Sequence, residues 1–155
     1  FNEAILNSTA LYDYQPRVPQ SMVAWFEAKQ RGGFPVIGVE DAAGTLLAFG
    51  SYGTFRAYPA YKYTVEHSVY VHKDHRGQGL GRTVMQALIA AARQNEVHAL
   101  VGAIDAANAG SIALHEGLGF ARVGTMPQVG FKFGRWLDLA LYQLLLETPA
   151  RPVDG

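Results

Sequence analysis

The segment HRGQGLGR (His75–Arg82) places three glycines at alternate positions between two arginines. It follows the apolar run SVYV (Ser68–Val71) and leads into TVMQALIAAARQ (Thr83–Gln94), so the sequence predicts a turn between a strand and a helix. The first amides of a helix have no partner inside it, and glycines let those amides close around an anion. Because Arg76 and Arg82 add positive charge, this turn is expected to bind a phosphate or pyrophosphate.

Two common nucleotide-binding loops do not match the turn. A Walker loop needs the pattern GxxxxGK[ST], and the chain contains no such string. A Rossmann turn needs GxGxxG with an acidic residue about 20 positions later. Here Gly77, Gly79 and Gly81 form GxGxG, and the region where the acid is expected reads VHALV. A turn whose glycines only relieve backbone strain is the simpler alternative, and the flanking arginines favour an anion site over it.

Alternating patterns of strand and helix surround the turn and must position it. Helices are expected at Pro19–Gly33, from the turn to about Asn95, and at Asn108–Gly119. Strands are expected in the hairpin Phe34–Gly53, at Tyr61–His72, at Val97–Asp105, and as a pair within Phe120–Leu146. Together they predict an α/β (α+β) sandwich, in which helices cover both faces of one mixed, largely antiparallel sheet. Residues 1–147 are expected to form a single domain and residues 148–155 a loose tail.

The composition excludes several classes of function. Among 155 residues, 13 Lys and Arg balance 13 Asp and Glu, so no overall charge points to nucleic acid or to an anionic membrane. There is no cysteine, which excludes disulfides, thiolate metal sites and a cysteine nucleophile, and no metal site is expected. No apolar run reaches the roughly 18 residues of a membrane span and no signal peptide is visible, so a cytoplasmic location is expected. Phe1 is not a natural initiator and FNEAIL is typical of the end of a helix, so an opening segment is expected to be missing.

Four segments carry a resemblance to a known family. The loop RGQGLG, placed after a strand and opening a helix, resembles the acetyl-CoA pyrophosphate loop of the GNAT superfamily of N-acetyltransferases. VEHSVYV, NAGSIALHEGLGF and MPQVGFKFGRWLD are similar to its phosphinothricin and methionine sulfoximine/sulfone acetyltransferase subfamily. The resemblance implies acetyl-CoA as the acetyl donor, a cleft between two splayed parallel strands, and a homodimer. By the same comparison the first strand and part of the first helix are absent.

The resemblance also implies a set of cofactor contacts. The backbone of Val69, Tyr70 and Val71 would pair with the amides of the pantetheine arm, much as an added strand would. The pyrophosphate would lie on the loop residues Arg76, Gly77, Gln78, Gly79, Leu80, Gly81 and Arg82. Asn108 matches a cofactor-contacting asparagine of the family, and it is equally well placed to cap the helix that follows it.

Acetylation of an amine requires that the amine lose a proton, because only the unprotonated form attacks a thioester. Glu66 occupies the carboxylate position of the family and is the expected general base, with a surface ion pair as the alternative role. His115 lies seven residues after Asn108, where many family members have a tyrosine that protonates the leaving thiolate. A helix-packing role for His115 has nearly equal weight. By strict alternation His67 points away from Glu66, so the two share a pocket only if the strand bulges.

The remaining candidates concern the acceptor. Arg56 matches the carboxylate of an amino acid in shape and charge, and the resemblance places it at the substrate mouth with Ala57 and Tyr58. Lys132 is expected at the same mouth, either from this chain or from a neighbouring subunit. Phe131 and Trp136 are expected in the core or an interface. The other residues expected to touch the substrate are Glu66, His67 and Ser68. Two alternatives remain open: acetylation of protein N-termini or other amines, and a non-catalytic acyl-CoA sensor.

Overall fold

The computed structural model describes all of residues 1–155. Its helices are α1 (Asn2–Asn7), α2 (Pro19–Arg31), α3 (Leu80–Gln94) and α4 (Ala109–Gly117). Its strands are β1 (Val36–Glu40), β2 (Leu46–Thr54), β3 (Thr64–Val71), β4 (Ala99–Asp105), β5 (Ala121–Lys132) and β6 (Arg135–Leu145). Short 3₁₀ turns at Pro59–Tyr61 and Lys73–His75 flank β3. Every helix and strand expected from the sequence is therefore present.

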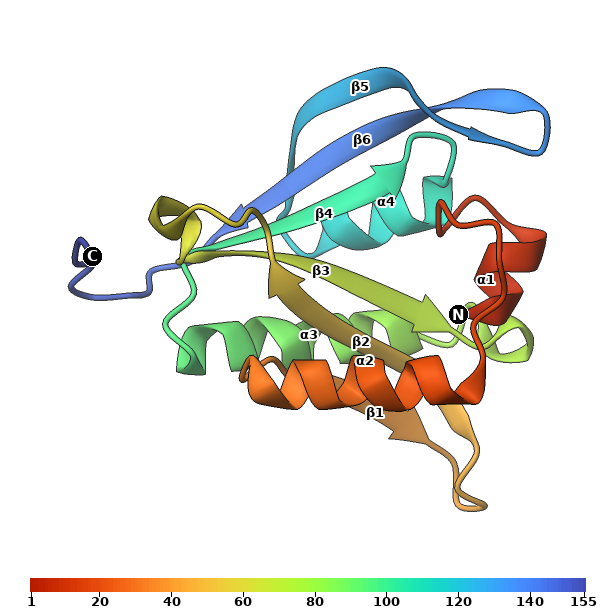
Figure 1. Cartoon of the computed structure of the whole chain (residues 1–155), viewed down its shortest axis with the longest axis horizontal. Coiled ribbons are helices and arrows are strands. Elements are labelled where there is room, and N and C mark those ends of the chain that lie inside the picture. Colours follow the sequence, from red (N-terminus) through yellow and green to blue (C-terminus); the bar gives the residue numbers. More distant parts are fainter.

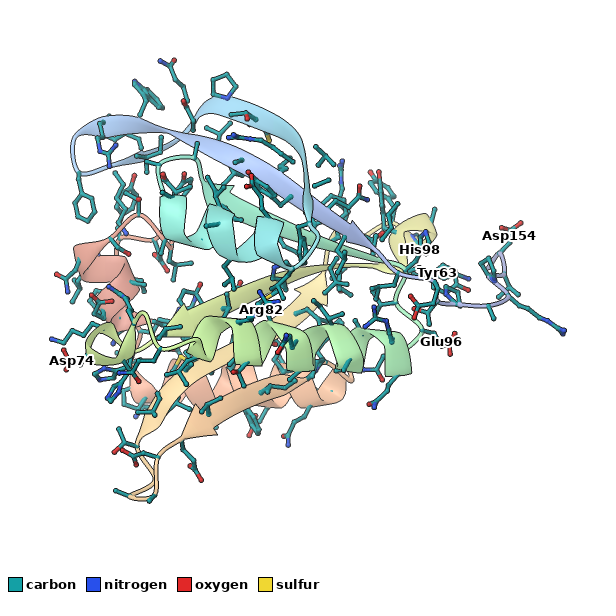
Figure 2. The ribbon with its side chains drawn as sticks, turned by 180° about the vertical axis from the view of Figure 1, so that it is seen from behind. Tyr63, Asp74, Arg82, Glu96, His98 and Asp154 are labelled. Carbon is teal, nitrogen blue, oxygen red and sulfur yellow. The ribbon has the colours of Figure 1, made fainter.

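The strands form one six-stranded sheet in the order β1-β2-β3-β4-β6-β5. All neighbouring pairs are antiparallel except β3 and β4, which run parallel. Helices α1 and α2 cover one face of the sheet and helices α3 and α4 cover the other, as the two opposite views show (Figures 1 and 2). The predicted mixed sheet with helices on both faces is confirmed.

The two faces of β3 differ because its residues alternate in character. Val65 and His67 are buried, whereas Glu66 and Ser68 between and after them are exposed. On the buried side α3 packs closely on β2: a Cβ at Gly50 would lie 2.7 Å from a methyl of Val84. The strand therefore has one apolar face toward α3 and one polar face toward the side of α1 and α2.

The parallel pair β3 and β4 separates part-way along its length. Backbone pairing runs from Thr64 opposite Ala99 to His67 opposite Gly102 and stops there, although β3 continues to Val71. Beyond His67 the strand stays paired with β2 on its other edge, so only the edge facing β4 is left free. The two carboxyl ends diverge in Figure 1. The expected splayed strand pair is confirmed.

The two ends of the chain pack on different parts of the sheet. The ring of Phe1 packs edge-on against Tyr70 and Phe49, with ring centroids 4.9 and 5.0 Å away. Residues 148–155 carry no helix or strand, yet the carbonyl of Thr148 lies 2.9 Å from Nδ1 of His98. No helix combines the length and apolar character that crossing a bilayer requires.

Candidate active site

The glycine turn opens directly into α3. Gly79 is the residue before the helix and has a left-handed backbone with φ of 77°, and Gly77 has the same φ. A Cβ at either position would meet no atom within 4 Å, so space lies open beside both. No side chain caps the helix. The free amides of the first turn of α3, the positive end of its dipole and the two glycines fit the predicted anion site.

The other residues of the turn have different tasks. Gly81 lies inside α3, where a Cβ would approach the side chain of Leu114 to 3.3 Å, so this glycine lets α3 and α4 come close together. The guanidinium of Arg76 donates to the carboxylate of Glu3 at 2.9 Å, which ties the turn to α1. Arg82 lies between α3 and α4 in Figure 2. Because the Arg76–Glu3 pair is exposed and weak, Arg76 can exchange Glu3 for an anion at little cost.

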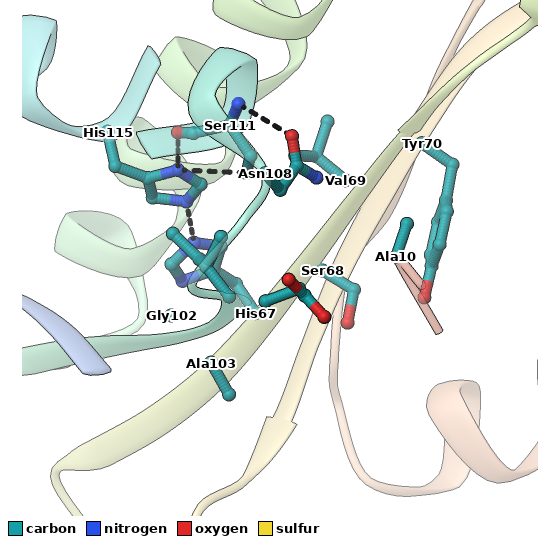
Figure 3. A pocket seen from close by; sticks show the side chains of 12 residues that line it. Ala10, His67, Ser68, Val69, Tyr70, Gly102, Ala103, Asn108, Ser111 and His115 are labelled. Atoms are coloured by element: carbon teal, nitrogen blue, oxygen red, sulfur yellow. Dashed lines mark hydrogen bonds between the residues drawn. The ribbon is translucent and has the colours of Figure 1, made fainter. Parts of the chain in front are cut away.

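A cleft of about 460 Å³ opens where β3 and β4 diverge. Its walls come from both faces of the sheet, as Figure 3 shows. The lining residues are Ala10, His67, Ser68, Val69, Tyr70, Gly102, Ala103, Ile104, Asp105, Asn108, Ser111 and His115. The splayed strands thus produce a continuous hollow beside the free edge of β3.

Asn108 caps α4 and also lines the cleft. Its side-chain oxygen accepts a hydrogen bond from the amide of Ser111 at 3.1 Å, which caps α4. Its side-chain NH₂ makes no hydrogen bond within the chain, and the residue lines the cleft. The cap role is confirmed, and the amide donors are left for a ligand.

Two histidines meet at the apex of the cleft. His67 on β3 and His115 on α4 are 5% and 2% exposed, and their Nε2 atoms lie 2.8 Å apart. Nδ1 of His115 lies 2.7 Å from the carbonyl oxygen of Ser111 (Figure 3). Burial lowers the pKa of His67 to about 3, with the nearby His115 adding to the effect, and burial also lowers the pKa of His115. Both imidazoles are therefore neutral near pH 7.

Glu66 lies on the opposite face of β3 from the histidine pair. The pairing of β2 with β3 is regular from Thr54 opposite Val65 to Ala48 opposite Val71, so no bulge turns His67 toward Glu66. The structure does not bring the two side chains into one group. Partial burial raises the pKa of the Glu66 carboxyl above its ordinary value. A carboxylate with a raised pKa is a stronger proton acceptor than an ordinary surface glutamate.

Arg56, Ala57 and Tyr58 line a second hollow of about 470 Å³ near the start of β3. The guanidinium of Arg56 lies 5.7 Å from the centre of the Tyr61 ring, which also lines this hollow. The structure brings the three expected substrate residues together here. This hollow shares no lining residue with the cleft.

Lys132 lies elsewhere. Its ammonium is buried and donates to the carbonyls of Ser8 and Leu11 at 2.7 and 2.8 Å, and it lines neither hollow. Desolvation lowers the pKa of this ammonium. Within one chain Lys132 therefore does not lie beside Arg56, because its charge holds the loop that follows α1. A contribution of Lys132 to the substrate mouth of a neighbouring subunit stays a prediction. Phe131 and Trp136 are 48% and 61% exposed, so the expectation of core positions is wrong and an interface remains open for them.

A sequence profile of the acetyltransferase (GNAT) family matches residues 3–120. The chain belongs to the GNAT acetyltransferase family. An L-methionine sulfoximine/L-methionine sulfone acetyltransferase of Pseudomonas paraeruginosa is 49% identical over 147 residues, which cover 95% of this chain and 86% of that protein.

Two solved GNAT structures extend the likeness. The structure of yncA from Salmonella typhimurium with its cofactor acetyl-CoA has a TM-score of 0.94 at 44% identity, and the match covers 99% of this chain and 88% of that one. A phosphinothricin acetyltransferase of Sinorhizobium meliloti in complex with acetyl-CoA has a TM-score of 0.93 at 33% identity, with coverage of 99% and 84%. These matches confirm the activity expected from the sequence, which is acetyl-CoA-dependent N-acetylation.

The glycine cradle of this GNAT enzyme leads to the first prediction. We expect Gly79→Val to weaken acetyl-CoA binding, because a β-branched residue resists a φ of 77° and its side chain would enter the open space beside the turn. Isothermal titration calorimetry with acetyl-CoA measures the change.

Gly44→Val is a matched control, since Gly44 has a φ of 81° and equally open surroundings. Gly44 lies in the turn between β1 and β2, so its replacement should strain the backbone and leave the affinity for acetyl-CoA unchanged. Equal affinities in the Gly79 variant and the unaltered enzyme would remove the cradle from cofactor binding.

Proposed function

We propose that this enzyme transfers the acetyl group of acetyl-CoA directly to the α-amine of a small amino acid of the methionine sulfone, methionine sulfoximine or phosphinothricin type. The observation that carries the proposal is the cleft between β3 and β4, which runs along the free edge of β3. The same strand carries Glu66 and is followed by the glycine turn that opens α3. The matches to these relatives cover nearly the whole chain, and the names of the relatives support the substrate class.

In this proposal three parts of the chain bind the acetyl donor. The free backbone groups of Val69–Val71 pair with the amides of the donor's arm, and the turn Gly77–Arg82 holds its pyrophosphate. Asn108 offers its free amide hydrogens from the cleft wall. Bound acetyl-CoA supplies an activated thioester. Because the chain has no cysteine to form an acetyl-enzyme, the acetyl group passes directly from the donor to the amine.

Glu66 and Arg56 act on the acceptor. Glu66 accepts a proton from the substrate ammonium, directly or through one water, so that the amine becomes nucleophilic. Arg56 binds the substrate carboxylate with a pair of charge-assisted hydrogen bonds. These roles rest on the family position of Glu66, on its raised pKa, and on the gathering of Arg56, Ala57 and Tyr58 around one hollow.

The exposed apolar side chains of the β5–β6 hairpin support a further part of the proposal, a homodimer. Seven large apolar residues of this hairpin are between 46% and 61% exposed: Val123, Met126, Val129, Phe131, Phe133, Trp136 and Leu145. A surface of this kind is favoured at interfaces between subunits. The cytoplasmic location and the absence of nucleic-acid and membrane partners stay predictions.

The experiment that tests the function measures thiol release from acetyl-CoA with a panel of amines. The panel contains methionine sulfone, methionine sulfoximine, phosphinothricin, a decarboxylated analogue and a short peptide with a free N-terminus. Rapid turnover of the first three supports the proposal. Preference for the peptide would favour a protein acetyltransferase, and acetyl-CoA binding without turnover would favour a sensor.

A substitution at Arg56 separates carboxylate recognition from the rest. We expect Arg56→Ala to raise KM for the amino-acid substrates far more than KM for acetyl-CoA, because a charge-assisted contact is lost. The decarboxylated analogue should be nearly indifferent to the change. Arg93→Ala is the control, because it removes an arginine that lines neither hollow and whose partner is Glu147. A KM that rises equally for both substrates would exclude Arg56 from carboxylate binding.

A further inference from the structure

The cleft between β3 and β4 carries a negative charge of its own. Asp105 is the one acidic residue among those that line it, and no lysine or arginine is among them. The two histidines of the lining, His67 and His115, are neutral near pH 7 because burial lowers their pKa values. The charge of Asp105 therefore has no counterpart within the cleft, and the proposed acetyl transfer assigns it no task.

Asp105 lies on the same face of the sheet as Glu66. Glu66 pairs with Val101 across the parallel strands, so their side chains share a face. The pairing of β4 with β6 is regular along the whole of β4, so no bulge interrupts the alternation of its side chains. Val101, Ala103 and Asp105 therefore all lie on the face of Glu66.

The histidine pair lies on the other face. A Cβ at Gly102 would lie 3.1 Å from Cε1 of His67 and 3.3 Å from Nε2 of His115, so this intervening position of β4 faces the two rings. Figure 3 shows the side chain of Ala103 on the far side of the strand from His115. The charge of Asp105 thus faces the side on which Glu66 lies.

Neutral donors hold the Asp105 carboxylate in place. Oδ2 accepts a hydrogen bond from the hydroxyl of Tyr12 at 3.0 Å, and Oδ1 accepts one from the amide of Ala107 at 2.8 Å. Burial and the bond to Asp105 raise the pKa of the Tyr12 hydroxyl, so it keeps its proton and donates. None of the ion pairs of the chain includes Asp105. Because Asp105 is buried, solvent screens its charge less than that of a surface carboxylate.

The candidate acceptor residues and Asp105 follow one another along β3 and β4. The hollow of Arg56 includes Thr64, the first residue of β3, which pairs with Ala99. Glu66 comes next, and Asp105 lies about 20 Å beyond Ala99 at roughly 3.3 Å per residue. An amino acid with its carboxylate toward Arg56 and its amine near Glu66 therefore directs its side chain along this face toward Asp105.

We propose that Asp105 is a specificity-determining residue of the acceptor site, whose uncompensated negative charge admits side chains with a neutral end and disfavours side chains with an anionic end. This inference rests on the proposed acetyl transfer and deepens it, because it ranks the acceptors of one site. Asp105 need not touch the acceptor, since its charge acts through space. At an effective dielectric constant of about 20, two like charges roughly 6–10 Å apart weaken binding about 10- to 100-fold.

The acceptors named above form a matched set for this question. Methionine sulfone, methionine sulfoximine and phosphinothricin share the same amino-acid backbone and end in a tetrahedral sulfur or phosphorus that carries a methyl group. The sulfone and sulfoximine ends are neutral, whereas the phosphinate end is an anion at neutral pH. A difference in rate between the sulfone and the phosphinate therefore reports the charge at that end rather than its shape. Phosphinothricin should be the weakest acceptor of the three.

Asp105→Asn tests the charge with little change of shape. Asparagine keeps an oxygen that can accept from the amide of Ala107, and the hydroxyl of Tyr12 has a second acceptor in the carbonyl of Asp138 at 3.3 Å. We expect kcat/KM for phosphinothricin, relative to that for methionine sulfone, to rise roughly 10- to 100-fold in the variant. KM for acetyl-CoA should stay unchanged.

Asp138→Asn is the matched control. Asp138 acts on Tyr12 as Asp105 does, but it is exposed and lines neither hollow. Its carboxylate accepts a hydrogen bond from the amide of Gln128 at 2.8 Å. The control removes the same charge from the same neighbourhood, and solvent already screens that charge. The ratio of kcat/KM for the two acceptors should therefore not change.

The other possible outcomes reject this role of Asp105. An unchanged ratio in Asp105→Asn would show that its charge does not select the acceptor, and an accompanying rise in KM for acetyl-CoA would show that it binds the donor instead. An equal loss of kcat for every acceptor would show that it acts on the amine that they share. The unaltered enzyme provides a test without a variant, because equal kcat/KM for methionine sulfone and phosphinothricin would contradict selection by charge. Failure to acetylate either acceptor would instead reject the proposed function.

Discussion

Glu66→Gln is expected to lower kcat roughly 10²–10⁴-fold while the affinity for acetyl-CoA stays unchanged. Glutamine keeps the size of the side chain and its capacity for hydrogen bonds, but it cannot accept a proton at neutral pH. The pKa of the Glu66 carboxyl is raised by partial burial, which brings it closer to the pH at which the enzyme would work. The loss should shrink as the pH rises, because more of the amine is then already unprotonated.

The measurement is a pH profile of kcat for the unaltered enzyme and the variant. Glu40→Gln is the matched control, since Glu40 is an exposed strand glutamate at the end of β1. A near-normal kcat for Glu66→Gln from pH 6 to 9 would contradict the base assignment. The histidine pair or a water in the cleft would then be the remaining proton acceptor.

Acid should destabilise this fold more steeply than its carboxylates alone require. The pKa of His67 is lowered from 6.5 to about 3 by burial, so below pH 6.5 the unfolded chain binds a proton that the folded chain does not. The stability due to the neutral ring is complete above pH 6.5 and is lost as the pH falls toward 3. This single group lowers the free energy of unfolding by about 1.4 kcal/mol for each pH unit in that range.

Urea unfolding between pH 7.5 and 4.5 measures this slope. His67→Gln should show a shallower dependence of the free energy of unfolding on pH than the unaltered enzyme, whatever its stability at neutral pH. Parallel curves for the two proteins would show that His67 gains its proton as easily in the folded chain as in the unfolded one. The comparison is independent of acetyl transfer, so it tests the burial of the pair by itself.

The parts of the fold that depend on local sequence could be predicted well. Gly77 and Gly79 were expected to shape a cradle before a helix, and both adopt the left-handed backbone that glycine favours. Alternation along β3 placed His67 and Glu66 on opposite faces, and the structure agrees. The splay of β3 and β4 came from the resemblance of the loop and its flanking strand to the family.

What the sequence could not show depends on contacts between distant segments. The meeting of His67 with His115 follows from the packing of α4 beside the end of β3 and from the space above Gly102, which no local pattern encodes. Lys132 looked like a substrate ligand because a lysine near a family motif has no visible partner in the sequence. Its partners are two carbonyls more than a hundred residues away. The hydrophobic character of a residue also does not reveal whether the residue is exposed at the edge of a sheet. Trp136 is an example, because its side chain is exposed.

The attachment of the first residues has a consequence for the width of the cleft. Phe1 is anchored on the β3 side through Tyr70, and the carbonyls of Ser8 and Leu11 are anchored on β5 through the ammonium of Lys132. Residues 1–11 therefore bridge the β3 side and the β5 side of the sheet, between which β3 and β4 share no backbone pairing beyond His67. Ala10 of this bridging segment lines the cleft itself. A segment attached at both ends limits how far the two sides of the sheet can move apart. The width of the cleft that receives the acyl donor is thus set in part by Lys132, although Lys132 does not line the cleft.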